Sequence, residues 1–322
     1  MKKLLLPAVV LSAALICGCS TAAASAQEYY SIGMAYFELG KYEEAEKWLN
    51  RARQSDRTMT ASQYNLGRLA FERGRYFEAA DLFEDILKRD PDNVIALRAS
   101  AYTRIKTGDI DIAEKHYERL LNLIPESTDD GYNHALVLYA MERYTEAEQL
   151  LEKYMFSLRD NKDMLLLYAR CQSAQNKVEA IDSFANWLND NTDPRVRYEY
   201  AMTLEHHELY ARAMEEYRLA MSEITSSTAD IKRSDIRFAL ARVLLIADRE
   251  SGEGITEMRN AINEGFDDID AIEELLNGGK VSGENAVSLR SIIENMRRTA
   301  DEQEKERDEP EDSSETDDDK GF

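Results

Sequence analysis

Small and large apolar residues recur along this chain at a fixed distance of 34 residues. One small-residue series with this step is Ala45, Ala79, Ala113 and Ala147. A second small-residue series is Gly33, Gly67, Ala101, Ala135 and Ala169, and a series of large residues is Leu49, Phe83, Tyr117 and Leu151. A period of this length predicts a stack of similar units that bury a continuous core between neighbours.

The period and its residue types resemble the tetratricopeptide repeat. The resemblance implies that each unit is a pair of antiparallel helices, A and B, and that the chain is an all-α, right-handed solenoid. Small residues at positions 8 and 20 of a unit then lie where the two helices cross closely, and the large residue at position 24 fills the gap toward the next unit. Pro91 and Pro125, also 34 apart, end helix B of two units.

The repeats follow one another in phase and predict a solenoid over 28–264. Four units run without a gap over 26–59, 60–93, 94–127 and 128–161. A fifth unit (about 162–193), a sixth (194–227) and a degenerate seventh keep most of the pattern. Two short helices are expected to close the stack within 265–300: residues 269–277, stopped by two glycines, and residues 285–300, with Leu289, Ile292, Ile293 and Met296 on one face.

The N-terminal residues predict export. Two lysines and a mostly apolar run over 4–16 are typical of a signal peptide, and the run is too short to span a bilayer. Residues 16–19 (ICGC) resemble a bacterial lipobox, which implies a signal peptide over 1–18 and a lipid on Cys19. Residues 19–27 would then be a tether. The alternative is cleavage after Ala26, which would release a soluble periplasmic protein.

Composition excludes some partners. The chain has 62 acidic and 40 basic residues and a formal net charge of −22, so its general surface is unsuited to binding nucleic acid. Much of this charge lies in residues 301–322, which we expect to be a disordered acidic tail. An alternative function for the tail is to bind a basic partner or divalent cations.

The family resemblance also implies a binding surface. Positions 2, 5, 9, 12 and 13 of the A helices form one face, which we call the A-helix face. Its candidate peptide-binding residues are Tyr30, Met34, Phe37, Tyr64, Arg68, Phe71, Arg98, Tyr102, Lys106, Tyr132, Tyr139, Arg170 and Tyr198. Aromatic rings and arginines are typical of protein-binding surfaces. The alternative is that the rings pack on neighbouring repeats and the cations pair with local acids. A dicarboxylate clamp known in the family is not supported, because unit three has Ala99 where an Asn is required.

No catalytic residues, cofactor or metal site are predicted. The chain carries no glycine-rich phosphate loop, nucleophile elbow or HExxH motif. We expect His116 to be solvated, His134 to be a packed, hydrogen-bonded core residue and Cys171 to be buried. An enzyme with its active site in 228–300 is the rival from another class, but that region has no His or Cys.

The sequence therefore predicts a non-catalytic adaptor that binds a protein or peptide on its A-helix face. We expect it in the bacterial cell envelope, attached to a membrane through its N-terminal lipid. The outer membrane, on its periplasmic side, is favoured.

Overall fold

The computed structural model describes residues 25–154, 161–225, 231–248, 252–281 and 283–308, and side chains as far as residue 302. The predicted signal peptide, Cys19 and residues 309–322 lie outside the described residues. Helices account for all regular structure in the described ranges. Their bounds are α1 (Ala26–Glu38), α2 (Tyr42–Ser55), α3 (Thr60–Glu72), α4 (Tyr76–Leu87), α5 (Val94–Thr107), α6 (Ile110–Leu123), α7 (Thr128–Ala140), α8 (Tyr144–Glu152), α10 (Lys162–Ala174), α11 (Ala180–Asp190), α12 (Pro194–His206), α13 (Tyr210–Glu223), α14 (Arg233–Ala247), α15 (Glu253–Asn263), α16 (Ile269–Asn277) and α17 (Gly283–Asp308).

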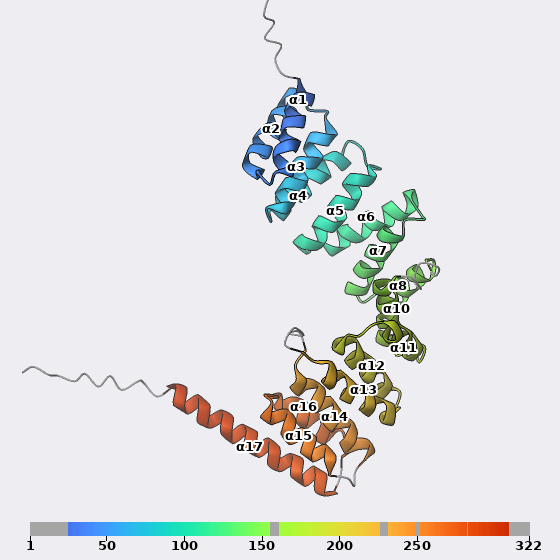
Figure 1. The fold of residues 1–322 in the computed structure, drawn as a ribbon, viewed down its shortest axis with the longest axis vertical. Helices are drawn as coiled ribbons and strands as arrows, with labels where there is room; N and C mark the ends of the chain where they lie inside the picture. The colour runs from blue at the N-terminus through green and yellow to red at the C-terminus, as the bar shows by residue number, and fades with distance from the viewer. Residues whose placement is uncertain (1–24, 155–160, 226–230, 249–251, 282, 309–322) are drawn as a thin grey trace, which may run out of the picture. The chain divides into compact units, whose positions relative to one another are not determined.

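The helices form two compact units, which we describe separately. The first ends at Arg143 and contains α1–α7, and the second begins at Tyr144 and contains α8–α17. The division falls inside the fourth repeat, between its A helix α7 and its B helix α8. Within each unit, successive helices pack as antiparallel pairs (Figure 1), which confirms the predicted all-α helical-repeat solenoid.

Capping side chains explain where many A helices begin. Residues with a side-chain oxygen precede the first turn and accept a hydrogen bond from its backbone N–H groups, as N-caps do. At Ser25 the bond is reciprocal, because the Glu28 carboxylate also accepts from the Ser25 backbone N–H. The caps of five A helices are Ser25, Asn93, Ser127, Asn161 and Asp193.

The predicted small residues lie where helices A and B cross. A Cβ atom added to Gly67 of α3 would lie 2.6 Å from Cε1 of Phe83 on α4, and one added to Gly33 would lie 2.8 Å from Cγ of Leu49. Both distances are shorter than carbon atoms tolerate. The large residue at position 24 therefore packs on the small residue at position 8 of its own repeat. The sequence predicted only a contact toward the next repeat.

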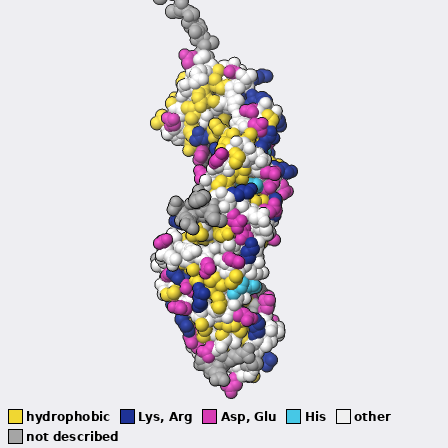
Figure 2. All heavy atoms as spheres, turned by 90° about the vertical axis from the view of Figure 1, so that its right-hand side faces the viewer, with side chains coloured by type: hydrophobic (Ala, Val, Ile, Leu, Met, Phe, Trp, Pro, Cys, Tyr) yellow, Lys and Arg dark blue, Asp and Glu magenta, His cyan; other side chains and the backbone are white. Residues whose placement is uncertain are grey.

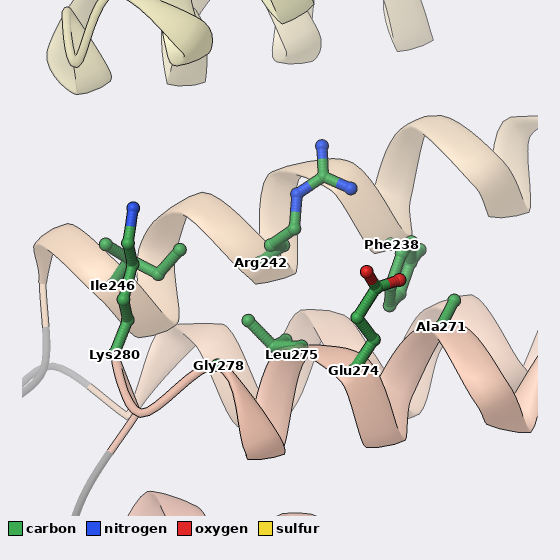
Figure 3. Close-up of a pocket in the computed structure, with 8 residues that line it drawn as sticks. All are labelled: Phe238, Arg242, Ile246, Ala271, Glu274, Leu275, Gly278 and Lys280. Atoms are coloured by element: carbon green, nitrogen blue, oxygen red, sulfur yellow. The ribbon is translucent and has the colours of Figure 1, made fainter.

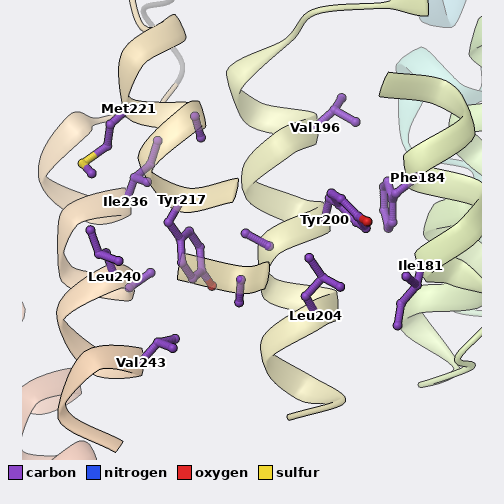
Figure 4. Close-up of a cluster of buried hydrophobic side chains, with 14 of the residues drawn as sticks. Ile181, Phe184, Val196, Tyr200, Leu204, Tyr217, Met221, Ile236, Leu240 and Val243 are labelled. Carbon is purple, nitrogen blue, oxygen red and sulfur yellow. The ribbon is translucent and has the colours of Figure 1, made fainter. Parts of the chain in front are cut away.

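The second unit has a continuous core between helix pairs. Its buried side chains come from α10, α11, α12, α13 and α14, and Figure 4 shows Phe184, Tyr200, Tyr217 and Leu240 among them. Tyr217 is fully buried and its hydroxyl donates to Oε2 of Glu205 at 2.7 Å. Burial raises the pKa of Tyr217, so this hydroxyl stays a donor.

The C-terminal helix is longer than its apolar pattern predicts. Leu289, Ile292 and Ile293 are buried against the preceding helices, on the face that the sequence indicates. However, α17 continues to Asp308, whereas we expected helix only as far as Ala300 and disorder beyond it. Residues 301–308 (DEQEKERD) are mostly good helix formers, which accounts for the extension without apolar burial.

The prediction for Cys171 holds, and the prediction for His134 holds in part, because neither of its buried ring nitrogens has a hydrogen-bond partner. Cys171 is fully buried, which raises the pKa of its thiol to about 12. His134 is buried and stacks on Tyr117, with ring centroids 6.4 Å apart. The expectation that His116 is solvated is wrong: its side chain is only 15% exposed, and its Nε2 lies 3.5 Å from Glu84 Oε1. Burial lowers the pKa of His116.

Candidate functional site

The A-helix face of the first unit is carried by α1, α3, α5 and α7. These helices hold all the predicted binding residues except Arg170 on α10 and Tyr198 on α12, which belong to the second unit. In the face of the molecule drawn in Figure 2, acidic and basic side chains are interspersed with hydrophobic patches.

A polar link joins α1 to α3 and organises three of the predicted residues. The amide of Asn65 donates from Nδ2 to the hydroxyl of Tyr30 at 3.1 Å, and its Oδ1 accepts from Nη1 of Arg68 at 3.1 Å. The Arg68 guanidinium also lies over the ring of Phe37, 5.0 Å from its centroid. Arg68 forms no ion pair with any described residue, so its charge is held by an amide and a ring.

An aromatic contact continues the face from α3 to α5. The rings of Phe71 and Tyr102 have centroids 5.4 Å apart, and Phe71 also contacts Tyr76. Tyr102 is 48% exposed, and Nζ of Lys106 lies 5.7 Å from the centroid of its ring. Lys106 is itself exposed and has no carboxylate partner in the described ranges. This part of the face therefore combines the exposed ring of Tyr102 with a cation, Lys106, that has no carboxylate partner among the described residues.

Tyr64 packs inside the protein, as predicted by the alternative in which the aromatic rings contribute to packing and not to a binding surface. Its ring centroid lies 5.6 Å from that of Phe83, and it is partly buried against the core of the first unit. Tyr64 therefore contributes to the joint between helices A and B more than to an open surface.

Arg98 already has a carboxylate partner inside the protein. Its Nε and Nη2 donate to Oδ1 and Oδ2 of Asp130 at 2.7 and 2.6 Å. Burial would raise the pKa of Asp130, but the hydrogen bonds from Arg98 and Ser127 outweigh it and hold this pKa below its usual value. The pair lies at a surface pocket of about 500 Å³ that is lined by Arg98, Ser127, Asp129, Asp130, Tyr132 and Asn133.

The second unit repeats this arrangement. Arg170 donates from Nε and Nη2 to Glu199 at 2.7 and 2.8 Å, and Arg242 donates to both oxygens of Glu205 at 2.7 Å. The sequence predicts Arg98 and Arg170 as cations available to a ligand, with pairing to local acids as the alternative. In the structure an acid on the next A helix accepts two hydrogen bonds from each guanidinium, as the alternative predicts.

The second unit also contains a pocket that the sequence analysis missed. It has a volume of about 350 Å³ and lies between α14, which carries Phe238 and Arg242, and α16, which carries Leu275 (Figure 3). Its lining residues are Phe238, Arg242, Ile246, Ala271, Glu274, Leu275, Gly278 and Lys280. If the repeat register is carried into α14 with Ala241 at position 8, then Phe238, Arg242 and Ile246 fall at positions 5, 9 and 13. The same rule that selected Arg68 would thus have found them.

The described residues show neither a metal cluster nor a membrane-spanning helix. There, no group of three or more His, Cys, Asp or Glu side chains is arranged to hold a metal ion. Within the same ranges, no helix combines the length and the apolar character needed to cross a membrane.

Family models match three stretches of the chain. The tetratricopeptide repeat models match residues 26–58 and 64–128. A model described as anaphase-promoting complex, cyclosome, subunit 3 matches residues 106–187.

Two curated proteins illustrate the range of sequence relatives. An uncharacterized lipoprotein of Treponema pallidum is 24% identical over 153 residues, which are 48% of this chain and 78% of the relative. The human protein O-mannosyl-transferase TMTC3 is 26% identical over 128 residues, but the match covers 39% of this chain and only 14% of the relative.

Solved structures share the fold. A tetratricopeptide repeat protein from Parabacteroides merdae has a TM-score of 0.54 at 20% identity, covering 78% of this chain and 97% of that one. YrrB, described as a TPR protein with an unusual peptide-binding site, has a TM-score of 0.50 at 16% identity, covering 56% of this chain and 93% of that one. At these identities the likeness concerns the fold alone.

Proposed function

This chain belongs to the tetratricopeptide repeat family, and we propose that it is a non-catalytic adaptor that binds a segment of a partner protein on its A-helix face. The observation that carries the proposal is the surface formed by Arg68, Tyr102 and Lys106 in the first unit. Two cations without internal carboxylate partners flank exposed and half-buried aromatic rings. Such a surface suits a ligand that supplies both apolar side chains and a carboxylate.

The internal ion pairs sharpen this proposal. Arg98 and Arg170 hold Asp130 and Glu199 bidentately, so a ligand carboxylate would have to displace a protein carboxylate at either one. Arg68 and Lys106 need no such exchange. We therefore assign ligand recognition to the α1–α3–α5 part of the face and a structural role to Arg98 and Arg170.

We further propose that the protein is lipid-anchored in the cell envelope through Cys19, with residues 1–18 as signal peptide and 19–27 as tether. The lipobox-like ICGC sequence supports this, and the Treponema pallidum lipoprotein relative adds support. The solenoid would extend over 28–264, capping helices over 265–300 and the acidic tail beyond. A soluble periplasmic protein is the alternative, and its mature chain would begin at Gln27.

The TMTC3 relative does not favour a transferase. The match covers only 14% of that protein's length and 39% of this chain. We therefore assign no transferase activity to the chain.

The binding proposal is tested by charge reversal with a matched control. The Arg68→Glu/Lys106→Glu variant and the Lys47→Glu/Lys115→Glu variant have the same net charge, and the control lysines are exposed on the B helices α2 and α6. Partner capture from solubilised envelopes, followed by titration of the captured partner, should show at least about tenfold weaker affinity, or ~1.4 kcal/mol, for the first variant only. Equal affinity of both variants would place the site elsewhere.

The anchoring proposal is tested at the N-terminus. Mass spectrometry of the mature protein should find a lipid-modified Cys19 as its first residue, and Cys19→Ala should abolish the modification. A mature chain that begins at unmodified Gln27 would refute the proposal.

A further inference from the structure

The first A helix exposes a stripe that is buried in the later A helices. In the second, third and fourth repeats, position 7 is occupied by Leu66, Ser100 and His134, each at most 7% exposed. At position 10 lie Leu69, Thr103 and Val137, each at most 2% exposed. The equivalent residues of α1 are Ile32, which is 37% exposed, and Ala35, which is exposed.

The contacts made by the later repeats explain why their side chains at positions 7 and 10 are buried and those of α1 are exposed. The side chains at these positions touch helix B of the preceding pair, as when Ser100 Oγ donates to Glu84 Oε1 at 2.9 Å or when His134 stacks on Tyr117. No described residue takes that place against α1. We define Ile32 and Ala35, which lie three residues apart on one side of α1, together with the C-cap residue Leu39 as the end stripe. Leu39, at its C-terminal end, is 69% exposed.

Aromatic and cationic side chains border the end stripe. Tyr29, three residues before Ile32, stacks on Trp48 of α2 with centroids 5.8 Å apart. The guanidinium of Arg51 lies 4.7 Å from the centroid of the Trp48 ring. Tryptophan and tyrosine next to aliphatic and basic side chains are the combination found where proteins meet the headgroup region of a membrane.

The tether fixes what can reach this surface. Ser25 is the N-cap of α1, and the six residues from Ser20 to Ser25 extend at most about 21 Å. If Cys19 carries the lipid, as the proposed function holds, the bilayer lies within that distance of the start of α1. The end stripe begins two helical turns further along the same helix.

We propose that the end stripe, with Tyr29 and Trp48, rests on the lipid surface to which the chain is anchored. The contact is with headgroups and not with the acyl core, because the exposed carboxylates of Glu28 and Glu44 lie on the same helix pair. The proposal rests on the proposed anchoring at Cys19, and it adds a second point of attachment that orients the first unit at the membrane.

The tryptophan content of the chain permits a direct test. The chain has two tryptophans, and Trp187 is buried, so emission changes on lipid contact report mainly on Trp48. The full-length lipidated protein would be reconstituted into phosphatidylethanolamine–phosphatidylglycerol vesicles that contain lipids brominated near the headgroup. We expect a blue shift and strong quenching of the wild-type emission, and the same in a Trp187→Phe variant.

Two variants control for exposure alone. Ile32→Ser/Leu39→Ser should reduce quenching of Trp48, whereas Phe77→Ser, at a phenylalanine that is 72% exposed at the start of α4, should leave it unchanged. Lipidation of Cys19, read by mass spectrometry in each sample, separates the two proposals. Unmodified protein would refute the anchoring. Lipidated protein whose Trp48 is not quenched by the brominated lipid would overturn this inference alone. If Trp48 is quenched neither by brominated lipid nor by iodide added in the aqueous phase, a protein partner covers the end stripe, and the inference is overturned as well.

Discussion

Asp130 is fully buried and receives two hydrogen bonds from Arg98, at 2.7 and 2.6 Å. The pair joins α5 to α7, so a residue that the sequence assigns to ligand binding serves as a tie between repeats. The Arg170–Glu199 and Arg242–Glu205 pairs do the same in the second unit.

This arrangement predicts that Arg98→Met destabilises the protein. It leaves the buried Asp130 carboxylate with Ser127 as its remaining side-chain donor, which should cost about 2 kcal/mol of unfolding free energy. The double variant Arg98→Met/Asp130→Asn should recover part of the loss, because it removes the uncompensated charge. Denaturant titrations of both variants measure this, and purely additive effects would mean that the pair is not coupled.

Acid should weaken the same tie. The folded-state pKa of Asp130 lies below its ordinary value of about 3.9, so its contribution is present above that pH and is lost as the pH falls through the folded-state pKa. Below about pH 4, the free-energy difference between the wild type and Asp130→Asn should therefore shrink. A difference that stays constant down to pH 2 would contradict the low pKa.

The burial of His134 predicts a second pH dependence of stability. It arises from a buried neutral imidazole, whereas that of Asp130 arises from a paired carboxylate. Burial lowers its pKa, its Nδ1 has no hydrogen-bond partner, and its Nε2 lies 3.5 Å from Glu114. The folded state therefore binds fewer protons than the unfolded state, and stability should fall as the pH drops below the unfolded pKa of about 6.5. His134→Leu should flatten the stability profile between pH 7 and 5. Parallel profiles for wild type and His134→Leu would refute the assignment.

The contact between Gly67 and Phe83 predicts a steric effect. Gly67→Ala places a methyl group 2.6 Å from the Phe83 ring and should lower the unfolding free energy by about 1–3 kcal/mol. Combining it with Phe83→Leu should cost less than the sum of the two single variants, because the smaller side chain makes room. Thermal unfolding of the four proteins tests this, and strict additivity would contradict the close approach.

The tetratricopeptide resemblance carried by the 34-residue period was sufficient to predict the helix pairs and the small residues at their crossings, because packing at a crossing depends on side-chain size at a fixed register. It also placed Tyr30, Phe37, Arg68 and Tyr102 on one face. It could not tell which acid reaches which arginine, since Asp130 and Glu199 stand at different positions of their repeats. The link that Asn65 makes between Tyr30 and Arg68 was also not predicted, because the hydrogen-bond partners of an amide inside a helix cannot be identified from the sequence.

Two further features were beyond the apolar pattern. The pocket around Phe238 and Arg242 depends on α16 and on the segment that carries Lys280, which lie outside the repeat register. The end of α17 was misplaced because the pattern reports burial, whereas residues 301–308 form helix through backbone propensity.

The central claim is that a partner binds across Tyr102, between Arg68 and Lys106. Site-specific photo-crosslinking in intact cells tests it most directly, with p-benzoylphenylalanine placed at Tyr102 or, as control, at the more exposed Phe77 of α4. The account predicts a defined protein adduct from position 102 that is lost when Arg68→Glu/Lys106→Glu is added, and no such adduct from position 77. An adduct from position 77 with none from position 102, or one from position 102 that survives the charge reversal, would contradict it.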